Sequence, residues 1–166
     1  YWKVVEVNEA ETPSSWEGDL WSFVTADSVI VDGFESYNDD MDAGTAIFQT
    51  WVDGYDVPAN GNSVVGHYPD APFAERTTVY DGVQSMPFAY NNSGSYAYSQ
   101  AVRTFDDAQD WTKYGVKTLS LWFYGSESNS GGCQPYVKIN TTKVTYTGAA
   151  TDLTTAAWKQ WTIDLA

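Results

Sequence analysis

Apolar and polar residues alternate along several short segments of the chain. In residues 117–124 the side chains of Leu119, Leu121 and Phe123 fall on one side of an extended backbone, and residues 161–165 repeat this alternation. A period of two residues is typical of β-strands with one buried face. Both segments are therefore predicted to be strands.

Other runs of the same kind are shorter and are separated by residues that favour turns. Residues 152–157 alone indicate a turn of helix, with Asp152 or Thr154 as the candidate cap. Many short strands at this spacing predict an all-β fold, an antiparallel β-sandwich or jelly roll with little helix. The further strands are expected at residues 1–7, 19–25, 29–31, 84–90 and 99–105, and in a hairpin at 136–140 and 144–146.

The composition is that of a folded and strongly acidic protein. Of the 166 residues, 43% are hydrophobic, which supplies a packed core and excludes intrinsic disorder as the main description. Eight basic and 22 acidic side chains give a net charge of −14, which would repel a nucleic-acid backbone. No apolar run is long enough to cross a bilayer. We therefore expect neither nucleic-acid binding nor membrane insertion.

The acidic side chains are clustered in ways that leave two interpretations. The block at residues 38–42 is either a solvated loop or a divalent-cation site, because clustered carboxylates repel one another and a hard cation relieves that repulsion. The same choice applies to the loop at residues 53–62, where we favour a polar turn. Cys133 and His67 are the single cysteine and histidine, which leaves no internal disulfide and no second histidine for a zinc site or a triad.

A set of sequence motifs follows one another in a familiar order. Residues 31–37 read V-D-G-F-E-S-Y and are followed by Trp51. The order resembles that of jelly-roll carbohydrate-binding modules, family 11 in particular, and is closer still to a module repeated in large secreted bacterial multidomain proteins. The resemblance covers residues 29–166 and implies a galactose-binding-domain-like sandwich. The later matching segments are G-V-Q-S-M at 82–86, D-W-T-K-Y at 110–114 and L-S-L at 119–121.

The two ends of the sequence lead to a prediction about domain organisation. Residues 1–26 resemble the last two strands of a fibronectin-type-III-like domain, so we expect them to belong to a preceding domain of that or the immunoglobulin type, or to pack on the main one. The modules continue past the equivalent of Leu165 into further strands, whereas this sequence stops at Ala166. We therefore expect an interior piece of a longer polypeptide, with the module at 29–166 truncated at its C-terminus.

The resemblance also implies a structural calcium ion. The carboxylate of the D-F-E motif that binds calcium corresponds to Glu35, with Asp32 beside it, and Asp164 is a candidate for the ligand that the missing C-terminal motif would supply. The alternative is that these acids are solvated. An EF-hand is excluded, because the twelfth position counted from Asp40 is Trp51 and not a glutamate.

A sugar-binding surface is expected on aromatic residues of the loops, since sugar rings present apolar C–H faces that stack on aromatic rings. Tyr96 and Tyr98 are two residues apart and would share one face of a strand. The resemblance adds polar residues, because the concave groove of family-11-like modules uses Tyr, Asp, His and Arg. The alternative is that aromatics at a period of two belong to the core. The candidate ligand-binding residues are Tyr55, His67, Tyr68, Tyr96, Tyr98 and Arg103, with Phe73 and Trp51 as further aromatics.

Three functions are considered for the chain. The first is a noncatalytic, extracellular or cell-surface domain that binds a polysaccharide or glycan. The second is a structural or adhesive domain of a filament or surface layer, which contacts neighbouring domains or copies of itself through strand exchange. A glycan-active enzyme ranks third, because no motif places two carboxylates in an apolar pocket and no G-x-S-x-G elbow is present.

Overall fold

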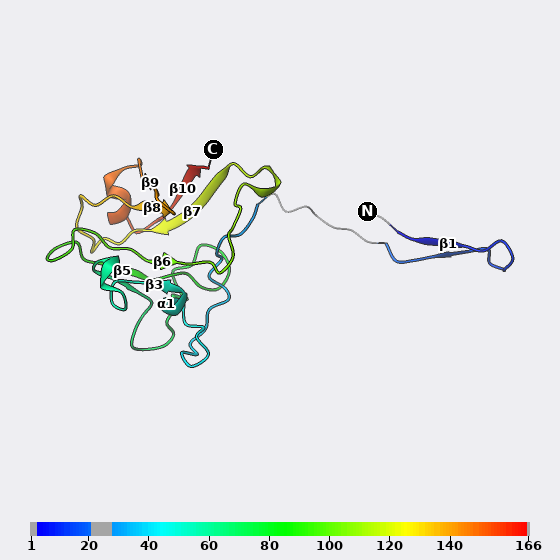
Figure 1. The fold of residues 1–166 in the computed structure, drawn as a ribbon, viewed down its shortest axis with the longest axis horizontal. Helices are drawn as coiled ribbons and strands as arrows, with labels where there is room; N and C mark the ends of the chain where they lie inside the picture. The colour runs from blue at the N-terminus through cyan, green and yellow to red at the C-terminus, as the bar shows by residue number, and fades with distance from the viewer. Residues whose placement is uncertain (1–2, 21–27, 166) are drawn as a thin grey trace.

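A computed structural model describes residues 3–20 and 28–165 of the chain (Figure 1). Within these ranges the strands pair in five antiparallel two-stranded sheets, and helix is confined to one four-residue α-helix and three short 3-10 helices. This confirms the predicted all-β class with little helix. Hydrogen bonds join the named strands only in pairs, so the described residues form no large continuous sheet.

The first sheet is a hairpin near the N-terminus. Strand β1 (Val5–Val7) pairs with β2 (Ser15–Glu17), and every residue described between 3 and 20 is exposed. The second strand of the hairpin therefore precedes the segment at 19–25 in which it was predicted. Residues 19 and 20 are not in a strand, and residues 21–25 lie outside the described part of the chain.

The longest strands are the two that the alternation predicted most directly. Strand β7 (Thr118–Tyr124) pairs along its whole length with β10 (Trp158–Asp164), and Figure 1 shows the two side by side. Exposure alternates residue by residue along β7, and in β10 Trp161 and Ile163 are buried. The alternation in the sequence thus corresponds to a less exposed and a more exposed face of the two-stranded sheet.

The predicted hairpin near residue 140 is also present. Strand β8 (Tyr136–Ile139) pairs with β9 (Thr142–Thr145), so the turn is only two residues long. Asn140 adopts a φ of 53°, a left-handed conformation that asparagine tolerates better than most residues. The second strand therefore starts two residues earlier than the pattern indicated.

The middle of the chain contains shorter elements than the sequence suggested. The strands predicted at 84–90 and 99–105 are shorter in the structure, β5 (Phe88–Tyr90) and β6 (Val102–Arg103), and residues 29–31 form no strand. Strand β4 (Ser63–Val65) pairs with β5, and β3 (Trp51–Val52) pairs with β6. The helical elements of this part are α1 (Ile47–Thr50) and the 3-10 helices η1 (Pro58–Asn60) and η2 (Lys113–Gly115).

The helical turn predicted near residue 152 is the 3-10 helix η3 (Ala150–Thr154). Neither Asp152 nor Thr154 caps it, because the N-cap position is held by Ala149 and no side chain bonds to the first turn. Asp152 instead accepts a hydrogen bond from the Tyr146 hydroxyl (2.7 Å) and pairs with Lys159 (3.0 Å). Asp152 therefore links η3 to β10 and does not act as the N-cap of η3.

The core of the fold lies where α1 meets β4. Ile47 and Val65 are fully buried, and Tyr37, Ala46 and Phe73 complete the cluster. These residues come from segments far apart in the sequence, so the core joins the helix, the strand and the loops on either side. In the described part of the chain, no helix is both long and apolar enough to cross a membrane.

This packing predicts a large difference between two identical substitutions. Ile47→Ala should lower the free energy of unfolding by about 2–5 kcal/mol, because it leaves a cavity in the core. Ile30→Ala removes the same atoms from a side chain that is 79% exposed, so its effect should stay within about 0.5 kcal/mol. Urea unfolding followed by tryptophan fluorescence measures both, and equal losses would contradict this description of the core.

Candidate functional site

Four aromatic rings form a continuous cluster at the surface. Tyr55 and Tyr68 are 69% and 47% exposed, and their ring centroids are 5.9 Å apart. Below them, Phe48 contacts the Tyr68 ring at 5.7 Å and the buried Phe73 ring at 5.2 Å. We call the two exposed rings the tyrosine platform. The structure thus brings together two of the predicted sugar-binding tyrosines on a packed aromatic base.

The loop that carries Tyr55 is organised by one buried carboxylate. Asp53 is 3% exposed, and its Oδ1 accepts hydrogen bonds from the backbone N–H groups of Tyr55 (2.9 Å) and Asp56 (3.2 Å). Its Oδ2 accepts the N–H of Val65 in β4 (2.6 Å). The acidic loop at 53–62 is therefore a turn closed by its own first residue, as favoured from the sequence.

A close backbone approach completes this loop. A Cβ atom at Gly54 would lie 1.8 Å from the carbonyl oxygen of Gly61, so only glycine fits there. The Gly54 N–H also donates to the Ser63 hydroxyl at 2.8 Å. The organising role of Asp53 is not among the features predicted from the sequence. The Asp-Gly pair at the start of a polar loop was the available signal, because aspartate often bonds to the backbone two residues on.

The loop that carries Tyr68 leaves the end of β4 and returns to the core. The His67 N–H donates to the carbonyl of Phe73 (2.9 Å), and the Asp70 N–H donates back to the carbonyl of His67 (3.1 Å). The Gly66 N–H donates to the carbonyl of Pro87 at 3.0 Å. Both platform loops are thus anchored to the same strand, which fixes the spacing between their tyrosines.

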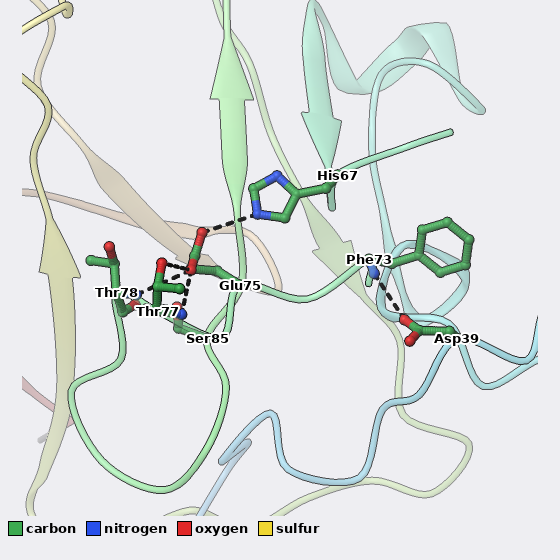
Figure 2. Close-up of polar contacts among 7 residues, drawn as sticks. All are labelled: Asp39, His67, Phe73, Glu75, Thr77, Thr78 and Ser85. Atoms are coloured by element: carbon green, nitrogen blue, oxygen red, sulfur yellow. Dashed lines mark hydrogen bonds and ion pairs between the residues drawn. The ribbon is translucent and has the colours of Figure 1, made fainter. Parts of the chain in front are cut away.

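His67 precedes Tyr68 of the platform in the sequence, and its side chain bonds to Glu75 (Figure 2). The His67 Nε2 is 3.1 Å from Glu75 Oε2, and because a carboxylate only accepts, Nε2 carries the proton. The other oxygen of Glu75 accepts the Thr77 hydroxyl and the N–H groups of Thr77 (2.5 Å) and Thr78 (3.1 Å). These bonds, the Thr77 hydroxyl first, lower the pKa of Glu75 to about 2.

The acidic block at 38–42 contributes one anchoring carboxylate. Asp39 accepts the N–H of Phe73 (2.8 Å) and pairs with Arg76 at 3.0 Å, as Figure 2 shows for Phe73. Asp40 and Asp42 are exposed. The block therefore behaves as a solvated loop with Asp39 holding the segment that returns to the core.

Tyr96 and Tyr98 form a second pair. Their rings meet edge to face at 5.8 Å, and the Tyr98 hydroxyl donates to the carbonyl of Ala59 (3.1 Å). The Tyr98 carbonyl accepts the N–H of Asn62 (3.3 Å). This pair holds the far end of the 53–62 loop, and Tyr98 is still 37% exposed.

Arg103 takes part in a network around Asp32, which has a side chain only 7% exposed. The guanidinium pairs with Asp32 Oδ2, and the same oxygen accepts the Tyr37 hydroxyl (2.6 Å) and the Trp51 indole N–H (2.7 Å). Oδ1 accepts the Phe34 N–H at 2.7 Å. Burial, followed by the bond to Asp32, raises the pKa of Tyr37 to about 12. The Arg103 charge is thus directed toward this carboxylate.

The predicted calcium ligands do not assemble into a site. Both oxygens of Asp32 accept hydrogen bonds, and the Arg103 guanidinium occupies the position at Oδ2 where a metal cation would bind. Glu35 Oε1 accepts the N–H groups of Val83 (3.1 Å) and Gln84 (3.3 Å). Asp164 ends β10, a strand that pairs with β7. Across residues 3–20 and 28–165, no group of three or more His, Cys, Asp or Glu side chains could hold a metal. Calcium binding by Asp32, Glu35 and Asp164 therefore stays a prediction, and the described residues bring no such group of ligands together.

Comparison with models of known protein families, with curated proteins and with solved structures finds no match to this chain.

The network around Asp32 predicts a stability effect that does not depend on calcium. Asp32→Asn should lower the free energy of unfolding by about 1.5–3 kcal/mol, because Arg103 loses its charged partner. Asp42→Asn, at an exposed position of the acidic block, should have little effect. Urea unfolding with calcium and with a chelator measures both. If calcium raised the urea midpoint of the natural protein and Asp32→Asn abolished that increase, Asp32 would be a calcium ligand and not only the partner of Arg103.

The bonds to Glu75 predict an acid-sensitive part of the stability. Since folding lowers this pKa from 4.5 to about 2, the stabilisation is present above pH 4.5 and is lost as the pH falls toward 2. Glu75→Gln should therefore show a smaller fall in its urea midpoint between about pH 6 and pH 3 than the natural protein. The exposed Glu127→Gln is the control, and an unchanged fall in Glu75→Gln would show that these bonds do not form.

Proposed function

We propose that this chain is a noncatalytic carbohydrate-binding domain whose tyrosine platform stacks on sugar rings. The observation that carries the proposal is the pair of exposed tyrosine rings that rest on the half-buried Phe48 and the buried Phe73. Large aromatic side chains are mostly buried in a core or an interface. A contiguous pair of aromatic rings that stays exposed therefore favours a binding surface. A sugar covers such rings with its C–H face and loses little of the hydration of its hydroxyls.

Preorganisation supports the platform as a binding surface. The loop of Tyr55 is tied by Asp53 and the loop of Tyr68 by backbone bonds to Phe73, so little conformational entropy remains to be lost on binding. His67 precedes Tyr68 in the sequence, and its side chain, which is 48% exposed, could orient a hydroxyl. Its bond to Glu75 fixes the imidazole for that role.

The finer description of the fold is part of the same proposal. An all-β chain with two long paired strands and many short ones is compatible with a β-sandwich of the jelly-roll type. We propose an extracellular or cell-surface location, which suits a polysaccharide ligand and the net charge of −14. In this proposal the platform binds sugar without calcium, because Asp32 and Glu35, two of the three residues expected to hold the ion, accept hydrogen bonds from protein donors.

A structural or adhesive function is the second candidate, and one observation favours it. Strands β7 and β10 are seven residues long, and within the described residues each bonds to a named strand along one edge only. An open edge presents N–H and C=O groups to which a strand of another chain can add. Self-assembly that Pro substitution in β10 blocks, with no polysaccharide binding, would favour this candidate.

The platform predicts the effect of single aromatic deletions on binding. Tyr55→Ala and Tyr68→Ala should each weaken polysaccharide binding by about tenfold, because each removes one stacking ring. Tyr55→Phe keeps the ring and should bind within about threefold of the natural protein. Affinity gel electrophoresis against neutral and acidic polysaccharides measures the retardation.

The matched control is Tyr114→Ala. Tyr114 is 82% exposed, more than either platform residue, but it is not part of the cluster. Its substitution should leave retardation unchanged. Equal losses in Tyr114→Ala and Tyr55→Ala would mean that retardation reflects nonspecific contact, and the proposal would fail.

A further inference from the structure

A second group of exposed aromatic rings lies on the outer face of the β7–β10 sheet. Trp122 and Tyr124 point to the exposed side of β7, and Trp158 of β10 lies directly opposite Tyr124. Tyr80 reaches this face from the loop before β5. We call these four residues the aromatic face. It shares no residue with the tyrosine platform and is built on different elements.

The rings of the aromatic face contact one another in sequence. Tyr80 stacks on Trp122 with centroids 3.9 Å apart and ring planes 16° from parallel. Trp158 meets the Tyr80 ring at 5.6 Å and the Tyr124 ring at 5.4 Å, both edge to face. Tyr80, Trp122 and Tyr124 are nevertheless 49%, 37% and 42% exposed. The rings therefore support each other while a large part of their surface stays in water.

Neutral polar groups continue the same face along the strands. Thr162 lies opposite Ser120, and Gln160 lies opposite Trp122. The Ser120 and Thr162 hydroxyls are 3.3 Å apart, and the Gln160 amide donates to Ser120 at 3.2 Å. Hydroxyl and amide groups both donate and accept hydrogen bonds. From Ser120 to Tyr124 the row is about 13 Å long, enough to contact more than one sugar residue.

The charges around this face select the class of ligand. Its rings and polar groups are uncharged, whereas Asp81 follows Tyr80, within a chain of net charge −14. This negative charge would repel an anionic ligand. A protein partner would be expected to meet an apolar centre with a polar rim, not a row of rings followed by hydroxyls and an amide. A neutral, hydroxyl-rich polymer complements both the aromatic rings and the row of hydroxyl and amide groups.

We propose that the aromatic face is a second, independent binding surface for a neutral polysaccharide. Sugar rings stack on Tyr80 and Trp122, and their hydroxyls exchange hydrogen bonds with Gln160, Ser120 and Thr162. The inference extends the proposed function but does not use the tyrosine platform. Two surfaces on one domain raise the apparent affinity for a long polymer, because the second contact forms within the same complex.

The experiment uses the full chain and separates the two surfaces by substitution. Soluble neutral β-glucan, mannan and xylan are the probes, and polygalacturonate is the anionic comparison. The Tyr55→Ala/Tyr68→Ala variant should still bind one neutral polymer, with a change in tryptophan fluorescence from Trp122 and Trp158. Adding Tyr80→Ala should weaken that remaining binding by at least tenfold, whereas Tyr80→Phe, which keeps the stacked ring, should not.

Tyr80→Ala is preferred to substitution of Trp122 because it changes no strand residue, and its urea midpoint confirms that the fold is kept. Binding that the platform substitutions abolish, while Tyr80→Ala leaves it unchanged, would overturn this inference and keep the proposed function. Binding of polygalacturonate in preference to neutral polymers would overturn the charge argument. A folded protein that binds none of the probes would overturn both proposals. A dimer that Tyr80→Ala dissociates would assign the face to a second copy of the chain instead.

Discussion

The geometry of the proposed site depends on the buried carboxylate of Asp53. A buried carboxylate is costly unless donors surround it, and this one accepts three backbone N–H groups. Two of these donors belong to the loop of Tyr55 and the third to Val65, which is fully buried in the core. One side chain therefore links the loop of the exposed Tyr55 ring to the buried core of the fold. The loop of Tyr68 leaves the same strand, so both rings share a single support.

Several acidic side chains of this protein organise its loops. Asp32, Asp39, Asp53 and Glu75 each accept a hydrogen bond from the backbone, and three of them also bond to a cationic or imidazole group. A protein with little regular secondary structure leaves many loop N–H groups without a strand or helix partner, and carboxylates supply acceptors for them. This explains why acids that look like metal ligands in the sequence bond to the protein itself.

The sequence predicted the features that rest on local pattern and not those that rest on distant contacts. The period of two in residues 118–124 identified a strand correctly, because alternation reflects one buried face. Two-residue strands such as β3 and β6 carry no such period, so their pairing could not be predicted. The sequence predicts Tyr55 and Tyr68 as loop aromatics, but no local pattern shows that their rings contact each other. Arg103 was expected to face a ligand, and only the fold places it against Asp32, 71 residues away.

The most direct test of the account observes the platform rings themselves. The ring protons of Tyr55 and Tyr68 can be assigned by NMR and followed while a neutral polysaccharide is added. Stacking on a sugar should shift the signals of both rings in a saturable way, while the Tyr114 ring, which is not part of the platform, keeps its shifts. Saturation by a polysaccharide that binds the protein but moves neither platform ring would contradict the central claim.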